Sequence, residues 1–167
     1  SRDLVWYTVG NEMHYLDLMV DPNAGMLSQF DNGLGAVTTL SYRSSIPLKA
    51  YEEAGIDPRD VSLAEVYDLS TALELDWIED LCLTPGGEAA AALRRGDTAI
   101  GGRIPVNVSG GLACFGEAVP AQAIAQVCEL TWQLRGEAGD RQVKGAKVGI
   151  TANQGLFGHG SSVIVKK

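Results

Sequence analysis

A glycine-containing loop between a β-like run and a long helical pattern, within residues 101–135, restricts the fold of this chain more than any other segment. The run over 104–108 is rich in branched apolar residues, and glycines follow it at 110, 111 and 116. Apolar residues then recur at helical spacing until Gly136 ends the pattern: Val119, Ala123, Val127, Leu130 and Leu134. Glycines let a ligand approach the backbone closely, and a helix that follows points its free N–H groups at the loop. The segment therefore predicts a strand–loop–helix unit that binds a ligand, with Glu117 near the start of the helix.

Strand and helix patterns alternate in the rest of the chain. Branched and aromatic residues predict strands over 4–9, 62–67, 146–151 and 161–165. Apolar spacing and capping residues predict a helix that Ser44 or Ser45 starts and Gly55 ends, and two more over 70–82 and 88–94. Residues 11–32, which include His14, have no period and predict a long excursion with a short helical piece. We expect one α/β domain over 1–167, with a mixed sheet covered by helices.

Charge and cysteine content exclude several classes of partner. The chain has 13 basic and 21 acidic residues and a net charge of −8, which argues against nucleic acid or an anionic membrane. Its three cysteines have no metal-ligand or disulfide spacing, so we expect no metal and a reducing cytoplasm. No stretch reaches the roughly 18 apolar residues of a membrane span. We expect Cys114 to be a small residue that faces the core.

Three loops hold the polar residues that follow apolar strands. They are Tyr67-Asp68, Asn107 to Glu117, and Asn153 to Gly160. In α/β sheets ligands bind where strand ends and helix starts converge, so these loops together predict a pocket.

The same residues carry a resemblance to a known family. The segments concerned read NVSGG from Asn107, LTWQLRGEAG from Leu130, YEEAGI from Tyr51, and AEVYD from Ala64. The chain from about Val5 onward resembles the C-terminal half of a thiolase, in the lipid-transfer-protein (sterol-carrier-protein) branch. The resemblance implies a layered unit with a mixed five-stranded sheet, which packs on an N-terminal half in a subunit that dimerises.

Two departures from the family change the expected chemistry. Where this branch has His-Asp-Cys-Phe, whose cysteine is the catalytic base, the chain reads Tyr67-Asp68-Leu69-Ser70. Where it has Gly-His-Pro, whose histidine polarises the thioester, the chain reads Gly116-Glu117-Ala118. Leu69 cannot accept a proton, and an ionised Glu117 would repel an enolate. Thiolysis is therefore not expected.

Tyr67 and Glu117 still offer proton transfer through oxygen. The family includes aldolases that typically have Tyr-Asp at this place and cleave steroid side-chain CoA thioesters in cholesterol breakdown, releasing a ketone and propionyl-CoA. The resemblance therefore implies a retro-aldol lyase. We expect Tyr67 to be the base, with a phenol pKa lowered from about 10, and Glu117 to be the second proton-transfer group. Each also has a structural interpretation: a buried tyrosine with a satisfied hydroxyl, and a carboxylate at a helix N-terminus.

The remaining site residues have supporting roles in this hypothesis. Asn107 and the backbone amides of Gly158, His159 and Gly160 are candidates to hold the thioester oxygen. Asp68 either orients neighbouring groups or caps the helix that begins near Ser70. The acyl-CoA is the substrate, and no separate cofactor is expected.

Part of the expected site lies outside this chain. Because residue 1 is not methionine, we expect the chain to start inside a longer reading frame, and the family's N-terminal half would supply most of the CoA-binding loop. The resemblance also implies a homodimer and an OB-fold (DUF35-type) partner. Two other functions stay open: a non-catalytic acyl-CoA or lipid-binding subunit, and a thiolase or acyltransferase.

Overall fold

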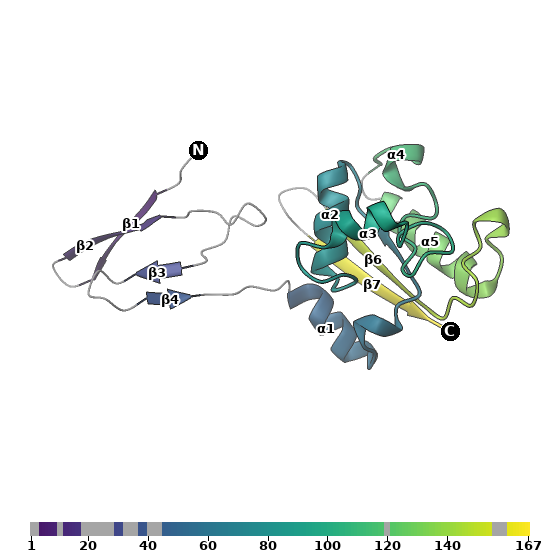
Figure 1. Ribbon diagram of the computed structural model, residues 1–167, viewed down its shortest axis with the longest axis horizontal. Helices are drawn as coiled ribbons and strands as arrows, with labels where there is room; N and C mark the ends of the chain where they lie inside the picture. Colours follow the sequence, from purple (N-terminus) through teal and green to yellow (C-terminus); the bar gives the residue numbers. More distant parts are fainter. Residues whose placement is uncertain are drawn as a thin grey trace. The chain divides into compact units, whose positions relative to one another are not determined.

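The computed structural model describes residues 50–118, 121–154 and 160–167 in full, and the backbone of strands β1 to β4 and of the first residues of helix α1. It divides into two compact units, Ser1–Arg43 and Ser44–Lys167 (Figure 1).

The first unit contains two antiparallel strand pairs. Strand β1 (Leu4–Val9) pairs with β2 (Glu12–Asp17), and β3 (Gln29–Asp31) pairs with β4 (Val37–Thr39). The strand predicted over 4–9 is confirmed. The described parts of 11–32 are strands, and His14 lies opposite Tyr7 in the β1–β2 register; residues 18–28 of the range expected to hold a short helical piece lie outside the described residues. Hydrogen bonds to a neighbouring strand satisfy the backbone groups of the β2 and β3 residues and stabilise an extended conformation that their local sequence pattern did not indicate.

The second unit has a mixed sheet in the order β5-β6-β7. Strand β5 (Leu63–Val66) is parallel to β6 (Val148–Gln154), and β7 (Gly160–Lys166) is antiparallel to β6. The predicted strands and mixed sheet are confirmed. Of the five strands expected, the described part of this sheet contains three. The run over 104–108 adds only an isolated parallel bridge, between Val106 and Ala64.

Helices cover the sheet, as predicted from the alternating patterns (Figure 1). Helix α1 (Ser45–Ala54) has Pro47 in its first turn, and α2 (Thr71–Asp80) begins after Ser70, whose hydroxyl accepts a hydrogen bond from Leu73 N at 3.3 Å. The other helical elements are η1 (Pro58–Asp60), α3 (Ala89–Arg95), α4 (Gly111–Phe115), α5 (Ala121–Arg135) and η2 (Gly139–Arg141). Helix α4 was not predicted.

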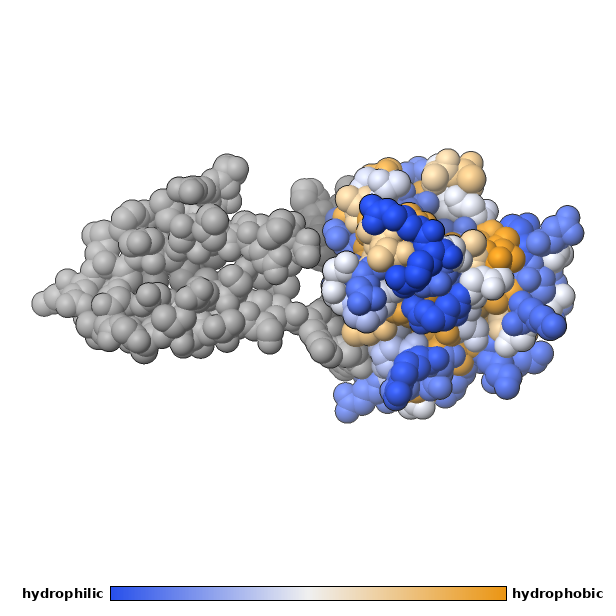
Figure 2. All heavy atoms as spheres, in the orientation of Figure 1, coloured by the Kyte–Doolittle hydropathy of each residue, from blue (hydrophilic) through white to orange (hydrophobic). Residues whose placement is uncertain are grey.

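The two faces of the sheet bury different residues, because side chains alternate along each strand. Ala64 and Val66 of β5 belong to one apolar cluster, with Tyr51 of α1 and Ile78 of α2. Leu63 faces the opposite way, into a second cluster formed with Leu130 and other residues of and beyond α5. The two clusters hold helices against both faces of β5. Figure 2 shows a largely hydrophilic outer surface on the visible face of this unit.

The buried face of α5 differs from the predicted one. Ala123 and Val127 are only half-buried, and Val119 lies outside the described residues. The most buried positions include four polar side chains, each at most 2% exposed: Gln122, Gln126, Glu129 and Gln133. The helix is confirmed, and Leu130 and Leu134 of the predicted face are buried. The buried face also includes polar positions that the apolar pattern did not indicate, because their side chains find hydrogen-bond partners there.

Candidate active site

Tyr67 and Glu117, the two proton-transfer residues proposed from the sequence, meet in the structure. The Tyr67 hydroxyl donates a hydrogen bond to Glu117 Oε1 across 50 residues of chain. Tyr67 is buried, with 5% of its surface exposed, whereas Glu117 is exposed. The pair therefore joins an enclosed phenol to a carboxylate that reaches solvent.

The backbone explains how these two side chains reach each other. Tyr67 extends β5 by one residue, since its N–H donates to Ala152 O of β6 at 2.8 Å. By strand alternation its side chain leaves the sheet on the same side as those of Leu63 and Glu65, which is the side that α5 covers. Glu117 lies in the segment between α4 and α5. The strand end and the approach to the helix thus converge on one point.

The pKa of Tyr67 corrects one expectation. The hydrogen bond to Glu117 raises it to about 12, and burial and the nearby carboxylate charge act in the same direction. The prediction that the pocket lowers this pKa is therefore wrong. The tyrosine is the donor and the carboxylate is the acceptor, so this hydrogen bond favours the protonated phenol.

Asp68 holds the start of α4. Its Oδ1 accepts a hydrogen bond from Leu112 N at 2.7 Å, while Ser70 caps α2. Gly111 allows this approach, since a Cβ at that position would lie 2.1 Å from Asp68 Oδ2. Of the two alternatives for Asp68, the structure therefore favours orientation of neighbouring groups.

Asn107 connects three parts of the site. Its Oδ1 accepts a hydrogen bond from Val66 N at 2.7 Å, and its Nδ2 donates to Glu74 Oε1 at 3.2 Å. The residue adopts a left-handed backbone, with φ of 51°. These bonds tie the loop to β5 and α2. Nδ2 carries two hydrogens, and the bond to Glu74 uses one of them.

The structure describes only some of the remaining predicted site residues. Gly158 and His159 lie outside the described residues, and Gly160 begins β7 opposite Gln154 of β6. Leu69, at the position of the family's catalytic cysteine, is 56% exposed. Cys114 is exposed on α4, so the expectation that it faces the core is wrong.

Two buried amide groups near the pair were not predicted. Gln122 Oε1 accepts a hydrogen bond from Ala118 N at 2.9 Å, and Gln126 Oε1 accepts one from Asn153 Nδ2 at 3.0 Å. Among the described residues, both Nε2 groups are buried without a hydrogen-bond partner. The Gln122 amide orientation is determined by its partner, since a backbone N–H requires an oxygen acceptor. The recurrence of glutamine four residues apart was the available signal.

No metal centre is found in the described part of the chain. It contains no group of three or more histidine, cysteine, aspartate or glutamate residues that could hold an ion. None of the helices in that part is long and apolar enough to cross a membrane.

Comparison with known proteins identifies a family. Residues 34–167 match the family described as thiolase C-terminal domain-like. Sterol carrier protein 2 of Rattus norvegicus is 47% identical over 110 residues, which cover 66% of this chain and 20% of that protein. Acetyl-CoA acetyltransferase of Methanothermobacter thermautotrophicus is 41% identical over 127 residues, or 76% of this chain and 33% of that protein.

A solved structure described as the Ltp2-ChsH2(DUF35) aldolase is also similar. It matches with a TM-score of 0.62 and 26% identity, over 73% of this chain and 31% of that one. The chain thus spans about a fifth to a third of the length of these relatives.

Proposed function

Because this chain belongs to the thiolase C-terminal domain-like family, we propose that the complete protein is a carbon–carbon lyase that cleaves a β-hydroxyacyl-CoA by a retro-aldol reaction. A steroid side-chain CoA thioester, giving a ketone and propionyl-CoA, is the substrate class we favour. The observation that carries the proposal is the hydrogen bond between Tyr67 and Glu117: Glu117 stands where the family's thiolases have their histidine, and Tyr67 lies two residues before the position of their catalytic base. The similarity to an aldolase structure supports the same reaction class.

The pair would move one proton through the reaction. The substrate hydroxyl gives its proton to the Tyr67 oxygen as Tyr67 passes its own proton to Glu117. The bond between the α and β carbons breaks, a ketone forms, and the electron pair becomes the thioester enolate. Tyr67 then protonates the α carbon while Glu117 returns the proton to Tyr67. The raised pKa of Tyr67 suits this relay, because the phenol stays protonated between the two transfers.

The enolate oxygen needs hydrogen-bond donors. Asn107 Nδ2 and the backbone amides of Gly158, His159 and Gly160 remain the proposed donors. The buried Nε2 group of Gln122 is a further candidate, because its amide binds the backbone of Ala118, next to Glu117. No metal or separate cofactor is proposed, since CoA enters with the substrate.

Partners complete the proposed enzyme. We propose that an N-terminal thiolase half covers α5, whose Ile124 and Trp132 are 64% and 45% exposed, and that the protein is a cytoplasmic homodimer. The aldolase structure that resembles this chain has DUF35 in its description, which supports an OB-fold partner of that type.

Substituting Tyr67→Phe in the complete protein tests the proposal. We expect cleavage of a 17-hydroxy steroid acyl-CoA to fall by at least about a hundredfold, the usual scale for loss of a general acid–base group. Tyr51→Phe is the matched control, because Tyr51 is also buried and its hydroxyl donates to Leu81 O at 2.8 Å, away from Glu117. Unchanged ketone release by Tyr67→Phe would remove the proposed role.

A second function is favoured by one observation. Leu69 replaces the family's base, and relatives named sterol carrier protein 2 match this chain, so a non-catalytic acyl-CoA or lipid-binding subunit is the alternative. Binding of the acyl-CoA without ketone release would favour it. A thiolytic assay with free CoA tests the remaining thiolase or acyltransferase hypothesis, which the similarity to acetyl-CoA acetyltransferase supports.

A further inference from the structure

A buried glutamate lies two residues before Tyr67 and has no role in the reaction proposed above. Glu65 is fully buried in β5, with its side chain on the α5 side of the sheet. Its Oε2 accepts a hydrogen bond from Ser109 Oγ at 2.6 Å, and its Oε1 accepts one from Ser109 N at 3.1 Å. Both carboxylate oxygens therefore bind one residue of the loop that leads to Glu117.

Ser109 passes this constraint along the loop. Its Oγ accepts a hydrogen bond at 3.1 Å from the backbone N–H of Gly111, the first residue of α4. Asp68 takes the next amide of the same helix, that of Leu112. Glu65 and Asp68, which flank Tyr67 in sequence, thus bind the two ends of one short segment, 109–112.

Glu117, the residue that Tyr67 contacts, follows the held segment 109–112 at the far end of α4. Helix α4 runs from Gly111 to Phe115, Gly116 follows it, and Glu117 is next. The ring of contacts is therefore closed: Glu65 of β5 and Asp68, just beyond the strand, hold the segment, and the residues after it return Glu117 to Tyr67 at the same strand end.

We propose that Glu65, acting through Ser109, is a positioning residue that sets the contact between Tyr67 and Glu117. The inference rests on the proposed function for its catalytic consequence only, because the contacts that it concerns are present whatever the reaction. A carboxylate with both oxygens bound to one residue determines where that residue lies more strictly than a single hydrogen bond would.

The ionisation of Tyr67 reports on this contact. With Glu117 bound, the pKa of Tyr67 is about 12, so about 3% of the phenol is ionised at pH 10.5. A phenol with the ordinary pKa of about 10 is about 75% ionised at that pH. Glu65, whose pKa burial raises to about 7, is itself fully ionised at pH 10.5.

The experiment measures Tyr67 in the full-length protein labelled with ¹³Cζ-tyrosine, with Tyr67→Phe to assign the signal. Ser109→Ala removes the hydroxyl bonds to Glu65 and Gly111, and Glu65→Gln removes the second acceptor oxygen. We expect the ionised fraction of Tyr67 at pH 10.5 to rise at least tenfold in both variants. Ser109→Thr, which keeps the hydroxyl, should restore the parent value.

Glu129→Gln is the matched control. Glu129 is an equally buried carboxylate, but its partners are Gln133 and Arg141, and none of its described hydrogen bonds reaches 109–112. It should lose stability as Glu65→Gln does, without ionising Tyr67. Circular dichroism at pH 10.5 identifies a variant that has unfolded, and Ser109→Ala, which leaves the buried carboxylate in place, then decides.

The two proposals fail in different ways. A Tyr67 ionisation that stays near 3% in folded Ser109→Ala, or that rises equally in Glu129→Gln, overturns the positioning role whatever the activity. If the complete protein releases no ketone, the lyase function fails while the ionisation result still decides this inference. Where both hold, Ser109→Ala should lower kcat with little change in KM, because the substrate contacts remain.

Discussion

At the scale of single residues, the central finding is that Glu117 changes what Tyr67 can do. A tyrosine at a strand end would serve as a base if nearby donors lowered its pKa. Here a carboxylate accepts a hydrogen bond from the phenol and raises its pKa to about 12. The same substitution that removes the thiolase histidine therefore keeps the phenol protonated, and in the proposed reaction it makes Tyr67 one member of a proton relay.

Glu117→Gln should lower the pKa of Tyr67 toward 10, because the amide carries no charge and accepts a weaker hydrogen bond. The consequence for stability has a definite sign. A pKa raised in the folded state stabilises the fold at pH below 10, and this stabilisation is lost as the pH rises through 12. The free energy of unfolding should therefore fall more steeply between pH 10 and 11.5 in the parent than in Glu117→Gln.

Urea unfolding at pH 8, 10 and 11.5 measures this difference. Tyr51, whose pKa burial also raises, is present in both proteins and cancels in the comparison. Equal slopes would mean that Tyr67 and Glu117 do not interact in the folded protein.

At the scale of elements, the start of α4 depends on a glycine for both conformation and space. Gly111 has a φ of 63°, and its missing Cβ leaves room for the Asp68 carboxylate. The helix has only five residues, Gly111–Phe115, which is too short to be stable alone. The position of α4 is therefore set by the carboxylates of Glu65 and Asp68. The position of α4 in turn determines where Glu117 lies.

Gly111→Ala should destabilise the protein by about 2–5 kcal/mol, from the left-handed backbone and the clash with Asp68 together. Gly96→Ala is the matched control: Gly96 has a φ of 81° but open space around it, so only the backbone cost of about 1–2 kcal/mol applies. Chemical denaturation compares the two.

Removing the Asp68 side chain should relieve part of the cost at Gly111. The double variant with Asp68→Ala would then be more stable than the sum of the single changes predicts. Strict additivity would show that the close approach of these two residues does not limit the position of α4.

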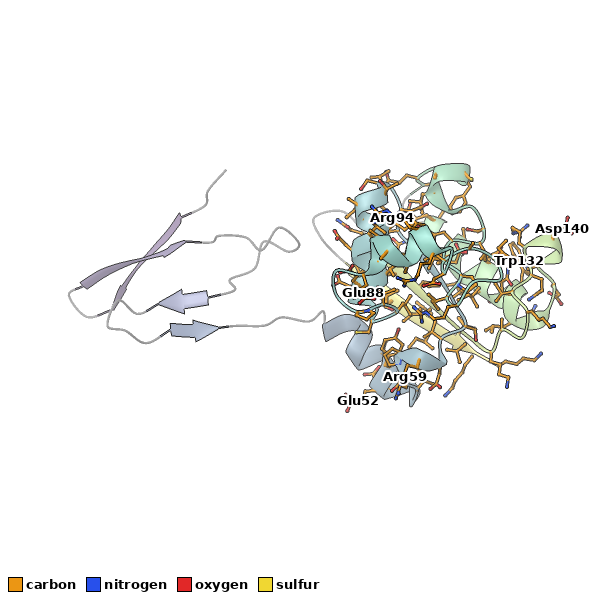
Figure 3. All side chains as sticks on the ribbon, in the orientation of Figure 1. Glu52, Arg59, Glu88, Arg94, Trp132 and Asp140 are labelled. Carbon is orange, nitrogen blue, oxygen red and sulfur yellow. The ribbon has the colours of Figure 1, made fainter. Side chains whose placement is uncertain are left out.

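At the scale of the whole molecule, α5 has two distinct sides, one buried against the sheet and one exposed. Its sheet side buries Leu130 and Leu134 together with polar side chains, among them Glu129, which pairs with Arg141 at 2.9 Å. Its other side exposes Ile124 and Trp132, the latter labelled in Figure 3. Large apolar side chains exposed on a helix are candidates to be covered by another part of the complete protein.

Acrylamide quenching of Trp132 tests whether a partner region covers this side. The 167-residue chain expressed alone should show a quenchable Trp132, identified by difference from Trp132→Phe. In the full-length protein we expect the quenching constant of Trp132 to fall at least threefold, because contact excludes the quencher. Trp77, which packs against the first apolar cluster, is the internal control and should not change. Equal quenching of Trp132 in the two proteins would contradict an N-terminal half on this surface.

The sequence by itself was sufficient for the elements and the family. Strand β5, the start of α2 near Ser70, the two C-terminal strands and the extent of α5 were predicted, because they depend on spacing and capping within a few residues. The segments around Asn107 and Leu130 were enough to indicate the thiolase-like family and to select Tyr67 and Glu117.

Only the tertiary structure decided how these residues act. Whether the pKa of Tyr67 rises or falls depends on a carboxylate 50 residues away in sequence. Local residue spacing does not show that folding brings the two side chains together. The polar part of the buried face of α5 was missed for the same reason: Gln126 and Glu129 are buried with hydrogen bonds from Asn153 and Arg141. Local patterns determine which segments become helices and strands, whereas partners brought together by folding determine which polar groups can be buried and how they ionise.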